Sequence, residues 1–165
     1  MTRHLFLLTV ILIGAGCASD LPRSGQRGFV LVTPAEVARE RRMQESAPPR
    51  SMEAKQDSQS PDIMLIRPAA LHDIASPTDI ELRFRAKDEA HVELRTLRVL
   101  YGMFGVNITP RILKHATITD SGIVAKEANL PVGSHQITIE IADNRNRVAR
   151  ESFRFIVKEA KTQQQ

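Results

Sequence analysis

The chain has little of several residue types that proteins use for covalent structure and for binding nucleic acid. Cysteine occurs once among 165 residues, as Cys17, so no disulfide can form within the chain and packing must hold the fold. Tryptophan is absent and aromatic residues are 4% of the sequence, whereas a nucleic-acid surface combines a basic stripe with interleaved aromatics. The net charge of +4 is small, and the basic residues are scattered among acidic ones. We expect no nucleic-acid partner.

The motifs of common nucleotide-binding and hydrolytic enzymes are also missing. The chain has neither a Walker motif nor a dinucleotide glycine motif, and Ser121 and Ser134 lie outside any Gly-x-Ser-x-Gly elbow. Asp88 and Glu89 do not form a catalytic pair in this interpretation, because neighbouring side chains on a strand point apart. We therefore predict that the protein is not an enzyme and uses no cofactor.

Metal sites are not indicated either. The histidines of the C-terminal region are widely spaced, and none pairs with another histidine or with cysteine at the spacing of metal ligands. Asp143-Asn144 and Asp120 could suggest a calcium loop, but calcium takes about six to eight oxygen ligands. Arg145 and Arg147 flank the turn and would repel a cation. We expect an ordinary turn at Asp143 and no bound metal.

What the chain does have is an N-terminal segment of the kind that directs export. A short basic start precedes an apolar run over residues 5–13, well below the roughly 20 residues of a membrane span. The small residues 14–16 then lead to Cys17, with Gly14 at the position where leucine is usual. This pattern resembles the signal peptide of bacterial lipoproteins.

The resemblance implies that residues 1–17 are a lipoprotein signal peptide and that Cys17 becomes the lipidated first residue of the mature protein. Bacterial lipoproteins carry two or more acyl chains, which is enough for stable membrane anchoring. Ala18 stands where an aspartate would signal retention in the inner membrane, so the resemblance favours the outer membrane, facing the periplasm. Ordinary secretory cleavage, an uncleaved anchor and a cytoplasmic cysteine stay open as alternatives.

Residues 18–60 differ in composition from residues 61–158. Thr33-Pro34-Ala35-Glu36 matches a capping box, so we expect a short helix over residues 34–44 with only a weak apolar stripe. The remainder is polar and contains prolines, which predicts a mostly disordered, flexible linker. As a flexible coil, residues 18–60 would span about 35 Å r.m.s. and hold the domain clear of a membrane. Whether Phe29–Val32 and the helix dock on the domain, dock on a partner or form an inert spacer is left open.

From residue 61 to residue 158 the pattern becomes one of short strands. Ile80, Leu82 and Phe84 alternate with charged residues, and isoleucines alternate with polar residues over 137–141. A further short run at 106–108 is stopped by Pro110. Seven or eight such strands, separated by turns, predict an all-β antiparallel sandwich followed by a frayed tail over 159–165.

The same region resembles bacterial immunoglobulin-like domains of the fibronectin or cadherin type. The stretch 130–135, Leu-Pro-Val-Gly-Ser-His, leads into the alternating strand 137–141 and then into a turn that opens at Asp143. Residues 76–80 resemble the entry to the second strand of these domains. The resemblance implies an immunoglobulin-like fold and transfers no function. Because His135 is in phase with the isoleucines, we expect it to be packed.

One local stretch suggests a binding surface. Tyr101, Met103 and Phe104 lie between or beside Gly102 and Gly105, which predicts a turn that carries an aromatic and a methionine. Such side chains are frequent at binding surfaces, which makes these three the candidate partner-binding residues. The alternative is a bent strand whose aromatic side chains fill the core.

These observations favour a non-enzymatic, lipid-anchored protein of the bacterial cell envelope. It would attach to a membrane through Cys17 and display an immunoglobulin-like module that binds an envelope protein or a polysaccharide. Two alternatives remain: an accessory subunit of an envelope hydrolase or secretion complex, and a purely structural spacer. The sequence leaves the oligomeric state open.

Overall fold

A computed structural model describes residues 28–46, 58–119 and 121–159 of the chain. The predicted signal peptide with Cys17, the residue Asp120 and most of the predicted tail lie outside the described residues. So do residues 18–27 and 47–57 of the predicted linker.

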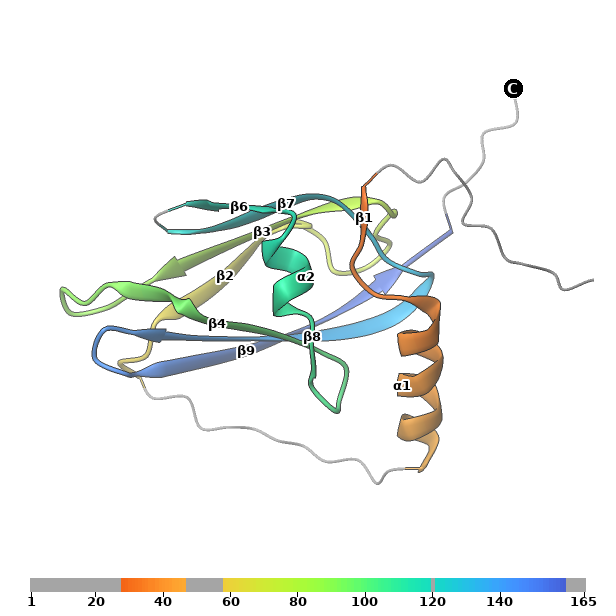
Figure 1. The fold of residues 1–165 in the computed structure, drawn as a ribbon, viewed down its shortest axis with the longest axis horizontal. Coiled ribbons are helices and arrows are strands. Elements are labelled where there is room, and N and C mark those ends of the chain that lie inside the picture. The colour runs from red at the N-terminus through yellow and green to blue at the C-terminus, as the bar shows by residue number, and fades with distance from the viewer. Residues whose placement is uncertain (1–27, 47–57, 120, 160–165) are drawn as a thin grey trace, which may run out of the picture.

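Two antiparallel sheets pack face to face around a shared apolar core (Figure 1). The first sheet runs in the order β2 (Asp62–Arg67), β3 (Thr78–Arg85), β7 (Gly122–Asn129), and the far edge of β7 is shared by the antiparallel β6 (Ala116–Thr119) and the short parallel β1 (Phe29–Val30). The second runs in the order β5 (Val106–Asn107), β4 (Val92–Tyr101), β8 (Gly133–Asp143), β9 (Val148–Val157). In immunoglobulin nomenclature these orders are ABED and CFG, with β5 added as an extra edge strand beside C. The predicted all-β immunoglobulin-like sandwich is confirmed.

The alternation in the sequence decides which side chains enter the core. In β3, Ile80, Leu82 and Phe84 are buried between the sheets, while the charged residues between them face outward. In β8, Ile137, Ile139 and Ile141 do the same from the opposite sheet. Because the side-chain period of a strand is two, these strands can bury their apolar face in only one register.

The chain departs from the predicted pattern after β5. The short strand predicted at 106–108 is present as β5 over Val106–Asn107, but Pro110 does more than end it: the short helix α2 (Thr109–Leu113) begins there, with the proline in its first turn. Proline fits this position because its missing N–H is one that a helix start leaves unbonded anyway. Ile108 and Ile112 are buried, so α2 closes the gap between the sheets on this side.

The N-terminal described segment packs on the sandwich, and we call residues 28–46 the strap. It begins with β1 (Phe29–Val30), which pairs in parallel with the end of β7 that β6 leaves uncovered. Leu31 and Val32 come next, 0% and 1% exposed. The helix α1 (Pro34–Ser46) then lies at the same end of the sandwich (Figure 1). Of the alternatives left open for Phe29–Val32, docking on the domain is the one observed, because three of these four side chains enter the core.

Candidate functional site: the turn after β4 and its supporting helix

The three candidate partner-binding residues divide between the core and the surface. Tyr101 ends β4 with its side chain 1% exposed, whereas Met103 and Phe104 are 42% and 47% exposed in the turn after that strand. Val106 of β5 is also exposed beside them. We call Met103, Phe104 and Val106 the turn patch. Tyr101 supports this patch from below and does not belong to its surface.

Two glycines allow the turn to form. Gly102 and Gly105 have φ angles of +72° and +66°, a region that costs a side-chain-bearing residue about 1–2 kcal/mol. The Gly102 N–H donates to the Gln136 carbonyl at 2.8 Å, and the Gly105 N–H donates to the Gly102 carbonyl at 3.3 Å. A Cβ on Gly102 would lie 2.3 Å from a carboxylate oxygen of Glu40, so this glycine is also required for the close approach of α1.

Glu40 connects α1 to the turn. Its carboxylate accepts a hydrogen bond from the Met103 N–H at 2.6 Å and another from the Gln44 side-chain amide at 3.0 Å. It is the single buried residue of α1. A carboxylate that accepts a backbone N–H makes one of the stronger hydrogen bonds in proteins. The turn patch is therefore held in one conformation from beneath.

The predicted capping box is present at the start of α1 and also binds a second element. The Thr33 N–H donates to the Glu36 carboxylate at 2.8 Å, and the Glu36 N–H donates to the Thr33 hydroxyl at 3.2 Å. Arg111 of α2 donates to both carboxylate oxygens of Glu36 at 3.0 Å and to the Leu31 carbonyl. The hydrogen bonds from Arg111 lower the pKa of Glu36 to about 2.

Below the turn, Tyr101 and His135 form a buried pair. The Tyr101 hydroxyl lies 3.0 Å from Nδ1 of His135, and Nε2 of His135 lies 2.8 Å from the Pro131 carbonyl. Since a carbonyl can only accept, Nε2 carries the proton and the tyrosine donates to Nδ1. Burial lowers the pKa of His135, and burial followed by the charges of Glu40 and Glu36 raises the pKa of Tyr101 to about 12. His135 is packed in the interior, as the sequence predicts. Its bond to the Pro131 carbonyl, four residues earlier, lies within the stretch 130–135.

An open hollow of about 440 Å³ lies where α1 meets the second sheet. Polar side chains from α1, β8 and β9 line it, and the buried Tyr101–His135 pair lies beneath them. The lining residues are Glu40, Gln44, Tyr101, Met103, Ser134, His135, Gln136 and Arg154. Met103 belongs both to the hollow and to the turn patch, so the two features form one continuous surface.

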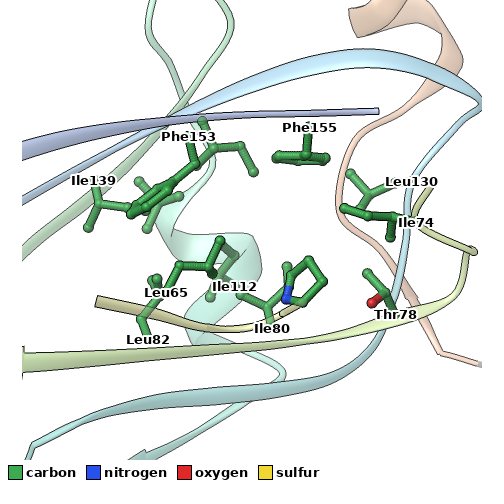
Figure 2. Close-up of a pocket in the computed structure, with 13 residues that line it drawn as sticks. Leu65, Ile74, Thr78, Ile80, Leu82, Ile112, Leu130, Ile139, Phe153 and Phe155 are labelled. Carbon is green, nitrogen blue, oxygen red and sulfur yellow. The ribbon is translucent and has the colours of Figure 1, made fainter. Parts of the chain in front are cut away.

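A second cavity lies inside the core (Figure 2). Apolar side chains of both sheets, among them Leu82 of β3 and Phe153 of β9, converge on a space of about 30 Å³. A cavity that holds a single water needs roughly 10–15 Å³ with polar partners, and an apolar lining keeps such a space dry. This void is a packing gap and is too small for an organic ligand.

The turn at Asp143 is held by arginine. The buried Asp143 carboxylate accepts the Arg145 and Arg147 N–H groups at 2.9 and 3.0 Å, and the Arg147 side chain at 2.7 Å. Burial alone would raise the pKa of Asp143, but these hydrogen bonds outweigh it and hold the pKa below the usual value. Asp143 therefore closes the β8–β9 hairpin as an ordinary turn, while Asp120 lies outside the described residues.

Metal clusters and membrane-spanning helices are both absent from the described part of the chain. Within residues 28–46, 58–119 and 121–159, no three histidine, cysteine, aspartate or glutamate side chains come together as metal ligands. None of the described helices is long and apolar enough to cross a membrane.

Sequence reasoning missed Glu40, Arg111 and the Tyr101–His135 bond. A partial signal existed for Glu40, because it stands four residues after the capping-box Glu36 and so shares its helix face. Arg111 is separated from Glu36 by 75 positions, and nothing in the local sequence connects them.

Comparison with known proteins adds little to this description. No family model matches the chain, and no curated protein matches it. Among solved structures, the crystal structure of CopC from Methylosinus trichosporium OB3b is similar with a TM-score of 0.39 and 19% sequence identity. The match covers 59% of this chain and 94% of that one. Likeness at this level carries no functional information.

Proposed function

We propose that this chain is a non-enzymatic, lipid-anchored protein of the bacterial cell envelope that binds a protein or polysaccharide partner through the turn patch. Cys17 would carry the lipid, and the protein would face the periplasm from the outer membrane. The signal-like pattern of residues 1–17 supports the anchor. The geometry around Met103 and Phe104 supports the binding role.

The observation that supports the binding role is a pair of exposed apolar side chains on a backbone fixed by hydrogen bonds. Met103 and Phe104 are exposed, yet their backbone is fixed by Glu40, Gly102 and the Gln136 carbonyl. A surface that is ordered before it binds loses less conformational entropy when a partner arrives. The hollow beside the patch supplies amide, hydroxyl and guanidinium groups that can hydrogen-bond to the partner.

The anchor is tested by replacing the single cysteine. In the native host, the Cys17→Ser protein should leave the membrane fraction and lose incorporation of a labelled fatty acid. Membrane association that persists in Cys17→Ser, with no lipid label on the unaltered protein, would show that the chain is not a lipoprotein.

The binding role is tested by photo-crosslinking from two surface positions of the full-length protein in living cells. Benzoylphenylalanine replaces Phe104 in one variant and Ile118 of β6 in the other, a residue 55% exposed on the opposite sheet. We expect a discrete adduct from position 104 that position 118 does not give. Identical patterns from both positions would indicate a spacer and contradict the proposal.

A further inference from the structure

The docked strap shortens the distance between the predicted anchor and the domain. A linker over residues 18–60 would let the sandwich stand well away from the membrane. Since β1 already packs on β7, only residues 18–27 separate Cys17 from the folded unit. Ten residues span at most about 33–36 Å in any conformation. If Cys17 is lipidated, the end of the sandwich that carries β1 and α1 stays within about 36 Å of the anchor, a distance that allows α1 to touch the bilayer (Figure 1).

The charges of α1 are sorted between its two faces. Its acids Glu36 and Glu40 face the domain, where Arg111 and the Met103 N–H bind them. The basic residues of the helix all face outward and are exposed: Arg39, Arg41 and Arg42. Glu45 is the one acid on the exposed side, which leaves that side with a net charge of about +2 (three arginines minus one glutamate).

These arginines differ from those of the sheets. Six of the seven strand arginines form ion pairs with aspartate or glutamate, and the seventh, Arg154, donates to the Gln136 amide oxygen; the six are Arg67, Arg83, Arg85, Arg95, Arg98 and Arg150. Arg39, Arg41 and Arg42 form no ion pair with an acid anywhere in residues 28–46, 58–119 or 121–159. The apolar contacts of α1 are few, with Val37 and Met43 only half-buried. The helix therefore contributes little to the core but presents three unpaired guanidinium groups at the tethered end.

We infer that Arg39, Arg41 and Arg42 bind the anionic phospholipid headgroups of the bilayer that holds Cys17. This inference rests on the proposed lipid anchor, which brings the helix within reach of the headgroups. Guanidinium groups bind phosphate through paired N–H donors, and each basic residue at an anionic surface strengthens binding about fivefold. With α1 lying on the bilayer, the opposite end of the sandwich, at the β8–β9 turn, points away from it (Figure 1).

The test uses the chain from residue 18 onward, without lipid, because every described element lies after residue 27. Co-sedimentation is measured with phosphatidylglycerol vesicles and with phosphatidylcholine vesicles. We expect binding to the anionic vesicles alone, and binding that weakens as salt is raised. The variant R39Q/R41Q/R42Q should bind on the order of 100-fold more weakly.

A matched control removes the same charge elsewhere. The variant R83Q/R95Q/R145Q changes three exposed arginines of the sandwich and should bind nearly as well as the unaltered chain. Glu45→Gln removes the one exposed acid of α1 and should strengthen binding several-fold, a gain that misfolding could not produce. Circular dichroism confirms that each variant is folded.

The outcomes separate this inference from the proposed function. Equal losses in the two triple variants, or equal binding to both vesicle types, would overturn the inference. Binding to an anionic polymer such as dextran sulfate but not to phosphatidylglycerol vesicles would also overturn it. If vesicle binding behaves as expected while the unaltered protein incorporates no labelled fatty acid, the basic surface stands and the lipid anchor fails.

Discussion

Helix α1 and the sandwich it packs on are held by different kinds of interaction. The sandwich buries whole faces of β3, β8 and β9, and the ion pairs on its outer faces are exposed. The helix buries one side chain, Glu40, and is fixed by that carboxylate and by the Glu36–Arg111 pair. Apolar burial contributes about 25 cal/mol per Å² at any pH, whereas a carboxylate contact exists only while the acid is ionised. The two regions should therefore fail under different conditions.

The largest effect is expected from a cavity in the sandwich core. Leu82→Ala removes a side chain that is 2% exposed and lies beside the existing void (Figure 2). The neighbouring side chains already leave a void here, so the substitution should enlarge it, and we expect a loss of about 2–5 kcal/mol in the free energy of unfolding. Urea denaturation measures it, with α1 and the sandwich unfolding together.

Ile118→Ala is the control for Leu82→Ala, because it shortens an apolar side chain that is mostly exposed on β6. Its unfolding free energy should stay within about 0.5 kcal/mol of the unaltered chain. A loss in Ile118→Ala as large as that in Leu82→Ala would contradict the assignment of the core.

Gly102→Ala should release the helix while leaving the sandwich folded. Gly105→Ala incurs the same positive-φ cost of about 1–2 kcal/mol, but its Cβ would meet only Leu100 at an ordinary 3.7 Å. The Cβ of Gly102→Ala would instead displace the Glu40 carboxylate. Hydrogen exchange should therefore show lost protection over 34–46 in Gly102→Ala and not in Gly105→Ala. Equal loss in both would mean that Glu40 does not hold the helix.

A smaller, pH-dependent effect is expected at Glu36. Its pKa is about 2 in the folded protein against a usual value of 4.5, so the folded state stabilises the ionised form. The contribution is complete above about pH 4.5 and is lost as the pH falls from there toward 2. Amide exchange in α1, corrected for intrinsic rates, should accelerate over this range before exchange in β8 does.

Glu36→Gln is the control for this titration, since it removes the charge that Arg111 binds. At neutral pH it should cost about 1 kcal/mol and raise the exchange of α1, and its acid response should be weaker. Asp143 also has a lowered pKa, so the β8–β9 hairpin loses stability in acid in both proteins. An unchanged acid response of α1 in Glu36→Gln would show that this ion pair does not control the helix.

The same contrast explains which parts of the molecule could be predicted from sequence. The alternation of apolar and polar residues in β3 and β8 is a local signal of burial, and it is sufficient to predict an all-β sandwich. The capping box at Thr33 was likewise local and is present as predicted. The docking of the strap depends on Arg111 and on the turn at Gly102, which lie more than 60 positions away along the chain. A helix with few apolar residues gives no sign of where its charged residues will bind.

Tyr101 shows the limit of reasoning from residue type. An aromatic next to a glycine-bounded turn is equally typical of a binding surface and of a core position. Tyr101 takes the core position because His135 is there to bond it: the hydrogen bond to Nδ1 satisfies the tyrosine hydroxyl in the interior. The bond joins β4 to β8 across neighbouring strands, and only the strand order reveals it.

The smallest effect on stability is expected at the turn patch. The proposed function predicts that the same patch has the largest effect on partner binding. The Met103 N–H donates to Glu40 of α1, and the exposed side chains of Met103 and Phe104 contribute little to the core. Met103→Ala with Phe104→Ala should change the free energy of unfolding by no more than about 0.5 kcal/mol. Capture of the partner identified by crosslinking from position 104 should fall at least tenfold, since apolar anchors at the centre of an interface carry most of its affinity. Retained capture together with a large loss of stability would assign both side chains to packing and leave the turn patch without a binding role.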